Sequence, residues 1–141
     1  MRLRKATQED AAKIVSIDPM ARTSSQRQQL LREAIATDTC WIALLGHDVT
    51  AYAILNYSFF CHGFIPLVYV GYRYRRQGTA LKLMRRLECE CHAAKLFTST
   101  NRSNLPMRGL LAKLRYREVG SIDGLDEDDA EVFHLKILSS S

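Results

Sequence analysis

Apolar and polar positions follow two different spacings along the chain. Helical spacing predicts four helices, at 8–17, after Ser24 or Ser25 to 35, at 79–94 and at 104–114. Stretches rich in Val, Ile and aromatic residues predict seven strands, at 2–6, 40–45, 49–57, 64–72, 96–100, 118–122 and 132–138. The resulting order, with one parallel strand-helix-strand unit among antiparallel strands, predicts an α/β (α+β) fold in which helices flank a mixed, mostly antiparallel sheet.

Local signals set several of these boundaries. Thr7, followed by Glu9 and Asp10, is typical of a helix N-cap with an acidic first turn. Asp18 precedes a proline, and because such residues avoid the helical region, the first helix should end there. The stretch 46–48, Gly-His-Asp, predicts a hairpin turn between two strands.

Length and composition indicate one compact domain, 1–141. A chain of 141 residues that is 47% hydrophobic can bury most of a core without disulfides or metal. No stretch approaches the ~18 apolar residues of a membrane span, and the N-terminus has no apolar leader, so we expect no membrane association. The four cysteines form no CxxC pair, which suits a reducing compartment. We therefore expect a soluble, cytoplasmic protein.

The formal net charge of +5 is unevenly distributed. Six basic residues fall within fourteen positions, namely Arg73, Arg75, Arg76, Lys82, Arg85 and Arg86. Six acidic residues crowd the far end, namely Asp123, Asp126, Glu127, Asp128, Asp129 and Glu131. One region thus suits an anion and the other a cation, and the alternative for each is a solvated face. We expect no nucleic-acid partner, because the basic run lacks interleaved aromatic residues and a helix-turn-helix pattern.

Residues 75–80 join a predicted strand to the start of a predicted helix. Such a junction presents several backbone N–H groups, with the helix dipole behind them, to one anion. Gly78 allows close approach of a phosphate, and the methyl side chain of Ala80 leaves room beside it. Arg75 and Arg76 add positive charge. The sequence therefore favours a phosphate site here, although ordinary strand-helix connections show the same short pattern.

These residues resemble motif A of the GNAT superfamily of N-acetyltransferases, Arg/Gln-x-x-Gly-x-Gly/Ala, which stands here as Arg75-Arg76-Gln77-Gly78-Thr79-Ala80. The stretch 67–72 before it and the amphipathic helix after it match the same arrangement. Residues 3–10 look like the usual first strand and helix start of that superfamily, and Asn104 looks like the asparagine of its later helix. The resemblance covers nearly the whole chain and implies the GNAT fold, with a splayed parallel strand pair at the CoA site.

The resemblance also implies acetyl-CoA as co-substrate. Backbone N–H groups from Arg76 to Ala80 would hold the pyrophosphate, and the helix of Asn104 would lie along the pantetheine arm. The Val70 N–H would point at the thioester oxygen, where one preorganised donor is worth ~10²–10³ in rate. The expected contacts with acetyl-CoA are Val70, Tyr72, Arg75, Arg76, Gln77, Gly78, Thr79, Ala80 and Asn104.

The candidate acid and base depart from the superfamily pattern. Many relatives carry a tyrosine, four residues before a Gly-Phe pair, that protonates the leaving thiolate. Here that tyrosine falls on Leu111 and the pair becomes Arg115-Tyr116, which leaves water or Tyr116 as the acid. No glutamate occupies 64–70, where some relatives carry a base. His62 is the candidate base, although an isolated histidine is more often packed or solvated.

A second constellation, Cys89-Glu90-Cys91-His92, contains residue types that bind metals. Residues two apart on a helix face away from one another, so this cluster is a poor metal site. We predict no metal.

The acidic run between the last two predicted strands suggests what the acceptor is. In the GNAT fold these strands border the acceptor side, so Asp126, Glu127, Asp128 and Asp129 are candidate contacts for a cationic amine. The expected function is acetyl transfer to a primary amine, with a small molecule favoured over a peptide or protein. The alternative, suggested by the missing tyrosine, is a catalytically weak acyl-CoA-binding regulatory module. A homodimer through the C-terminal strands is a further possibility.

Overall fold

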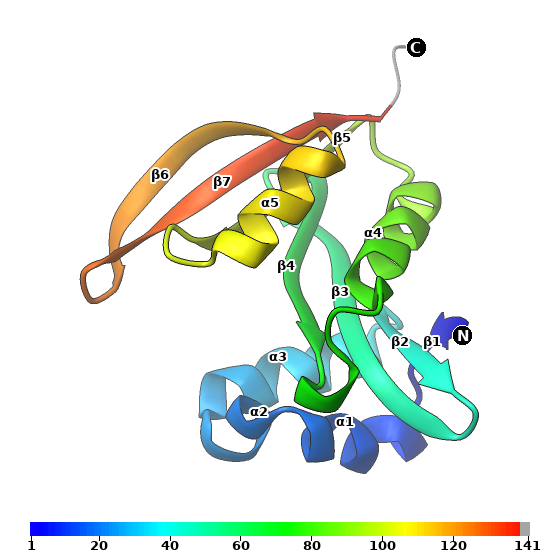
Figure 1. Ribbon diagram of the computed structural model, residues 1–141. Helices are drawn as coiled ribbons and strands as arrows, with labels where there is room; N and C mark the ends of the chain where they lie inside the picture. Colours follow the sequence, from blue (N-terminus) through cyan, green and yellow to red (C-terminus); the bar gives the residue numbers. More distant parts are fainter. Residues whose placement is uncertain (139–141) are drawn as a thin grey trace. The chain divides into compact units, whose positions relative to one another are not determined.

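The computed structural model describes residues 1–138 and follows the predicted order of elements with one additional short helix (Figure 1). The strands are β1 (Arg2–Lys5), β2 (Cys40–Leu45), β3 (Asp48–Phe59), β4 (His62–Val70), β5 (Lys95–Asn101), β6 (Arg117–Asp126) and β7 (Asp129–Ile137). The α-helices are α1 (Ala11–Ile17), α2 (Pro19–Thr23), α3 (Ser25–Ala36), α4 (Thr79–Glu90) and α5 (Leu105–Lys113), with 3-10 turns η1 (Gln8–Asp10) and η2 (Tyr72–Tyr74). No helix within 1–138 is long and apolar enough to cross a membrane.

The strands form one seven-stranded sheet in the order β1-β2-β3-β4-β5-β7-β6. The pairs β1–β2, β2–β3, β5–β7 and β6–β7 are antiparallel. Strands β4 and β5 are parallel, with Gly63–Ile65 opposite Leu96–Thr98. The mixed, mostly antiparallel sheet predicted from the sequence is confirmed.

Two compact units divide the chain. Unit 1 contains Met1–Leu55 and Leu67–Glu90, and therefore α1 to α4 with β1 and β2. Unit 2 contains Asn56–Pro66 and the described residues from Cys91 onward, and therefore α5 with β5, β6 and β7. Strands β3 and β4 contribute residues to both units.

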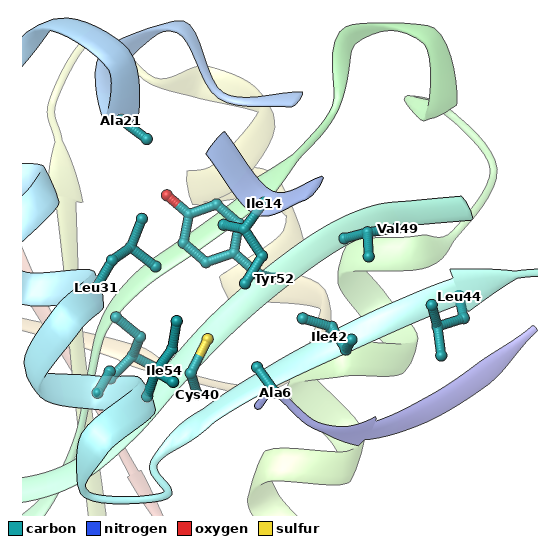
Figure 2. Packing of buried hydrophobic residues seen from close by; sticks show 12 residues of the cluster. Ala6, Ile14, Ala21, Leu31, Cys40, Ile42, Leu44, Val49, Tyr52 and Ile54 are labelled. Carbon is teal, nitrogen blue, oxygen red and sulfur yellow. The ribbon is translucent and has the colours of Figure 1, made fainter. Parts of the chain in front are cut away.

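The core of unit 1 lies between the first helices and β1 to β3. Figure 2 shows Ile14 of α1 and Leu31 of α3 on one side, with Ile42 of β2 and Ile54 of β3 on the other. Ile14 and Ile42 are fully buried, and burying such a side chain contributes about 1.5–3 kcal/mol. The apolar stripes that predicted α1 and α3 are the faces that this packing covers.

One helix, α2, is absent from the sequence-based prediction. Asp18 ends α1 as expected, but Pro19 then begins a new turn, since proline fits the first position of a helix. The Asp18 side chain accepts the Met20 N–H at 3.0 Å and so caps α2. Its fully buried carboxylate also accepts hydrogen bonds from the Tyr52 hydroxyl and, at 2.6 Å, from Arg27. These contacts fix α2 against α3 and β3.

Helix α5 covers one face of the sheet in unit 2. Arg108 of α5 bonds Glu118 at 2.7 Å, and Glu118 lies opposite His134 in the β6–β7 ladder. Residues directly opposite in an antiparallel pair share a face, so α5 lies on the face of Glu118 and His134. Thr98, opposite His134 on β5, belongs to this face and is buried. No other helix belongs to unit 2 within 1–138.

Candidate active site

The end of β4 leaves the backbone of Val70 turned away from β3. The Gly71 N–H donates to the Thr50 carbonyl oxygen of β3 at 2.8 Å. Successive backbone groups of a strand point to opposite edges, so the N–H and C=O of Val70 point to the other edge of β4. This orientation suits the oxyanion contact predicted for the Val70 N–H, and the role itself stays a prediction.

Arg75 folds back onto this strand end. Its Nε donates to the Val70 carbonyl oxygen at 3.0 Å, and its guanidinium lies 5.4 Å from the ring centre of Tyr69 and 5.7 Å from that of Tyr72. Arg75 therefore anchors the following loop to β4. Arg76 is exposed and forms no hydrogen bond or ion pair with any residue of 1–138, so its charge is available to a ligand.

The loop from Arg75 to Gly78 turns through two left-handed residues. Arg76 has φ +64° and Gly78 has φ +78°, a region that glycine enters without strain. Helix α4 then begins at Thr79, and its first intrahelical bond runs from Lys82 N–H to Gly78 O at 3.1 Å. The N–H groups of Thr79, Ala80 and Leu81 thus have no carbonyl partner within the helix.

This segment has the open space and free donors that the predicted diphosphate site requires. A Cβ added at Gly78 would meet no protein atom within 4 Å, so the space in front of the loop is open. Three unpaired N–H groups of the twelve-residue helix α4 and the Arg76 charge converge on the same short segment. The described residues contain no group of three or more His, Cys, Asp or Glu side chains that could hold a metal ion.

A pocket of about 450 Å³ also opens in unit 1, between α1 and the residues that follow β4. Two of its cationic side chains already donate to the backbone, Lys13 to the His47 carbonyl at 3.2 Å and Arg22 to the Ser16 carbonyl at 3.3 Å. The pocket was not predicted, because it depends on how α1 packs beside Gly71. We assign it no role.

Asn104 has a local structural role in unit 2. Its Oδ1 accepts the Met107 N–H at 3.2 Å, which makes it the N-cap of α5. The prediction that this helix begins at Asn104 is confirmed. A contact between Asn104 and acetyl-CoA stays a prediction.

The two candidate acid-base residues lie in different surroundings. His62 begins β4, and its ring is 5.5 Å from that of Phe97. His62 and Val70 are the two ends of β4, and seven residues lie between them in the sequence. Tyr116 is buried, with Lys136 Nζ 5.6 Å from its ring centre. The roles of His62 as the base and of Tyr116 as the acid stay predictions.

The acidic run is divided by the final hairpin. Asp126 and Asp129 pair across β6 and β7, so that only Glu127 and Asp128 form the tip, with Asp128 at φ +56°. Asp129 accepts hydrogen bonds from the N–H and hydroxyl of Ser103 at 3.1 and 2.6 Å. Asp129 thus holds a loop in place, whereas the tip carboxylates are exposed.

Asp126 belongs to a different group of polar residues. Its Oδ2 accepts from Asn101 Nδ2 at 2.8 Å, and Asn101 also donates to Glu131 at 3.3 Å. Ser99 donates to the other oxygen of Glu131 at 2.7 Å. Sequence reasoning did not single out Ser99 or Asn101. The sequence pattern that could have identified them is the alternation of Phe97, Ser99 and Asn101 along one strand, which places all three side chains on one face of the sheet.

Comparisons with known proteins bear on the family and the fold. The sequence model of the Acetyltransferase (GNAT) family matches residues 3–116. A GNAT-family acetyltransferase structure from Bacillus cereus is 26% identical, with a TM-score of 0.88 over 96% of both chains. No curated protein sequence matches the chain.

More distant structures share the fold. Ribosomal-protein-alanine N-acetyltransferase from Brucella melitensis is 18% identical, with a TM-score of 0.79 over 97% of this chain and 99% of its own. A candidate acetyltransferase from Salmonella typhimurium, solved with its cofactor acetyl-CoA, is 16% identical, with a TM-score of 0.79 over 99% of this chain and 95% of its own.

Proposed function

The chain belongs to the GNAT acetyltransferase family, and we propose that it transfers an acetyl group from acetyl-CoA to the primary amine of a small cationic molecule. The observation that carries this proposal is the segment from Arg75 to Ala80. Its left-handed Gly78, open front and unpaired helix N–H groups suit a diphosphate, and acetyl-CoA carries one.

The reaction is a direct exchange in a ternary complex. The amine nitrogen attacks the thioester carbonyl carbon, the C–N bond forms, and the C–S bond breaks. The sulfur leaves with the bonding electron pair, and the proton lost from the nitrogen balances the CoA thiol. Acetyl-CoA supplies the activated acyl group, since a thiol of pKa ~8.5 is a tolerable leaving group.

The chain's own contribution is binding and electrostatic stabilisation. The Arg76 side chain and the first N–H groups of α4 hold the diphosphate, and Arg75 keeps their loop against the strand end. The Val70 N–H, which points away from β3, stabilises the oxyanion of the tetrahedral intermediate. No side chain is required as a general acid in this account.

A small acceptor is favoured over a protein by the carboxylates of the final hairpin. Asp126, Glu127 and Glu131 would attract a compact cation, whereas a protein N-terminus also needs room for its backbone. The ribosomal-protein-alanine N-acetyltransferase from Brucella melitensis, at 18% identity, shows a shared fold and says nothing about the acceptor of this chain. The four cysteines are free, and we place the reaction in the reducing cytoplasm.

Thiol release with acetyl-CoA, measured against polyamines, arylalkylamines, amino acids and peptides, tests the proposal. We expect release with at least one small amine, and mass spectrometry should show the acetylated product. Calorimetry with CoA measures the binding of CoA separately from turnover. Tight CoA binding without thiol release for any amine would instead support a regulatory acyl-CoA-binding module.

A further inference from the structure

Unit 2 carries aromatic rings on the sheet face that α5 does not cover. Ser99 lies opposite Phe133, and Asn101 lies opposite Glu131, so these four residues share a face. Phe97 is two residues from Ser99 on β5, and Phe64 lies opposite Phe97 on β4. All of these residues therefore lie on the face away from Thr98 and His134, where α5 packs.

Phe59 is the centre of this cluster. Its ring centre lies 5.1 Å from those of Phe64 and Phe97 and 5.6 Å from that of Phe133. We call Phe59, Phe64, Phe97 and Phe133 the aromatic face. All four side chains are only half-buried, and the neighbouring Phe60 is 81% exposed. The aromatic face is therefore apolar surface left accessible, unlike the buried residues Leu96 and Val132 on the other side of the sheet.

One end of the aromatic face carries an oriented negative charge. Glu131 is two residues from Phe133 on β7 and is half-buried. Its two oxygens accept from the neutral donors Ser99, at 2.7 Å, and Asn101, at 3.3 Å. Asp126 accepts from the same Asn101 amide at 2.8 Å.

These carboxylates have no counter-charge. Within 1–138 no Lys, Arg or His lies within ion-pair distance of Glu131 or Asp126. Partial burial of a carboxylate is costly unless a cation or hydrogen-bond donors compensate for it. Here neutral donors fix the orientation of Glu131 and leave its charge for a ligand.

We propose that this surface binds the acceptor, and that the acceptor is a small arylalkylamine. The inference rests on the proposed function, which requires an amine. The ammonium group lies at Glu131, with Asp126 adding to the field, and the aryl ring stacks on Phe133 and Phe97. Aromatic pairs with ring centres about 4.5–7 Å apart are stabilised beyond what their buried area alone provides, so the surface discriminates against amines without a ring.

The arrangement argues against the simplest polycations. Spermidine spreads its charge along an alkyl chain, whereas this surface concentrates its negative charge at one end and offers rings over the rest. A primary ammonium next to one apolar ring matches both parts. The carboxylates select for an ammonium group, and the aromatic face selects for an aryl ring attached to it.

Steady-state thiol release with 2-phenylethylamine, spermidine and a short alanine-initiated peptide is the primary test. We expect 2-phenylethylamine to have the highest kcat/KM. Glu131→Gln should raise its KM about tenfold, most at low salt, while the KM for acetyl-CoA stays unchanged. Glu9→Gln, which removes the same charge from an exposed site in unit 1, is the matched control and should leave both constants unchanged.

Two variants at one position separate stacking from folding. Phe133→Leu keeps an apolar side chain of similar volume, and Phe133→Ala removes it. We expect the KM for 2-phenylethylamine to rise several-fold in Phe133→Leu and about tenfold in Phe133→Ala, with the KM for acetyl-CoA as the internal measure of a folded enzyme. 2-Phenylethanol has the ring without the charge and should act as a weak competitive inhibitor. Its inhibition constant should be at least tenfold higher than the dissociation constant of 2-phenylethylamine.

The outcomes separate the two proposals. Thiol release with spermidine or the peptide but not with 2-phenylethylamine, or an unchanged KM in Glu131→Gln, would overturn the arylalkylamine site and leave the acetyltransferase intact. Absence of thiol release with every amine would overturn the proposed function, and this acceptor assignment with it.

Discussion

Arg75 Nε donates to the carbonyl oxygen of Val70 across 3.0 Å, closing the loop between β4 and α4 back onto the strand end. The same guanidinium lies near the rings of Tyr69 and Tyr72. The two neighbouring arginines of the sequence motif therefore differ in role. On the proposed assignment, Arg75 holds the backbone predicted to bind phosphate, whereas Arg76 presents its charge to the ligand.

This difference predicts two distinct responses in acetyl-CoA binding. Arg76→Gln should weaken binding about tenfold at low salt and much less at high salt, because it removes a screened charge. Arg75→Gln should weaken binding to a similar degree at both salt concentrations, because its loss loosens the loop. Calorimetry at two ionic strengths measures both, and identical salt dependence for the two variants would contradict the assignment.

Replacing Gly78 by valine should weaken CoA binding by at least tenfold. A β-branched residue is strained at φ +78°, and its side chain would occupy the open space in front of the loop. Gly46→Val is the matched control, since Gly46 has φ +63° in the β2–β3 hairpin and equally open surroundings. Both variants should lose stability, and only Gly78→Val should lose CoA affinity.

The ion pair between Arg4 and Asp10 makes stability depend on pH. Hydrogen bonding from Arg4, at 2.8 and 3.0 Å, lowers the pKa of Asp10 from 3.8 to about 2. A lowered pKa stabilises the fold at a pH above the unfolded value, and this contribution is lost as the pH falls toward 2. Asp10→Asn should therefore cost about 2 kcal/mol at neutral pH and progressively less below pH ~4.

Denaturant unfolding of Asp10→Asn and of the wild type, from pH 7 down toward pH ~2, measures how the difference between their free energies of unfolding shrinks. Asp38→Asn provides the comparison, because its ion pair with Lys5 at 3.2 Å is exposed on both sides. That variant should change the free energy of unfolding by no more than about 0.5 kcal/mol. A constant difference between Asp10→Asn and wild type at every pH would refute the prediction.

Arg115 occupies a backbone conformation that favours glycine. It follows α5 with φ +70°, and its N–H donates to Ala112 O at 3.0 Å while the Tyr116 N–H donates to Leu111 O at 2.9 Å. This arrangement is a typical helix C-terminus with a left-handed residue. Arg115→Gly should raise the free energy of unfolding by about 1 kcal/mol. Lys113→Gly, inside α5, should lower it by about 1 kcal/mol, and thermal unfolding distinguishes the two.

His62→Ala should keep the wild-type kcat and pH profile. The ring packs beside Phe97, and a histidine without a charged partner is more often packed or solvated than a general base. Initial rates of thiol release, measured for His62→Ala and the wild type over a range of pH, test this expectation. A rate reduced by a factor of ~10²–10⁴, together with a flattened ascending limb of the pH–rate profile, would instead establish His62 as the general base.

The sequence predicted the elements better than their junctions. Apolar periodicity located α3 and α4, and of the two serines predicted to precede α3, Ser24 is the one that caps it, through the Arg27 N–H. Helix α2 was missed because Asp18-Pro19 signals both the end of one helix and the start of another. The buried Asp18 carboxylate that caps α2 is also bound by Tyr52, 34 residues away in the chain, and such long-range contacts leave no local pattern.

The candidate site shows the same division. The position of the phosphate segment followed from Gly78 and the strand-helix junction, but the bond from Arg75 to Val70 depends on the side chain folding back. The acidic run was predicted as one connection. Strand pairing of Asp126 with Asp129 instead separates its members, since one residue faces Asn101 and the other Ser103.

The division of the chain into two compact units has an evolutionary consequence. The phosphate-binding segment belongs entirely to unit 1, and Glu131 with the aromatic face belongs entirely to unit 2. On the proposed assignment, substitutions at Phe133 or Glu131 would change acceptor preference without altering the predicted phosphate-binding segment. Duplicated copies of such a gene can diverge in the amines they modify while the donor substrate is retained.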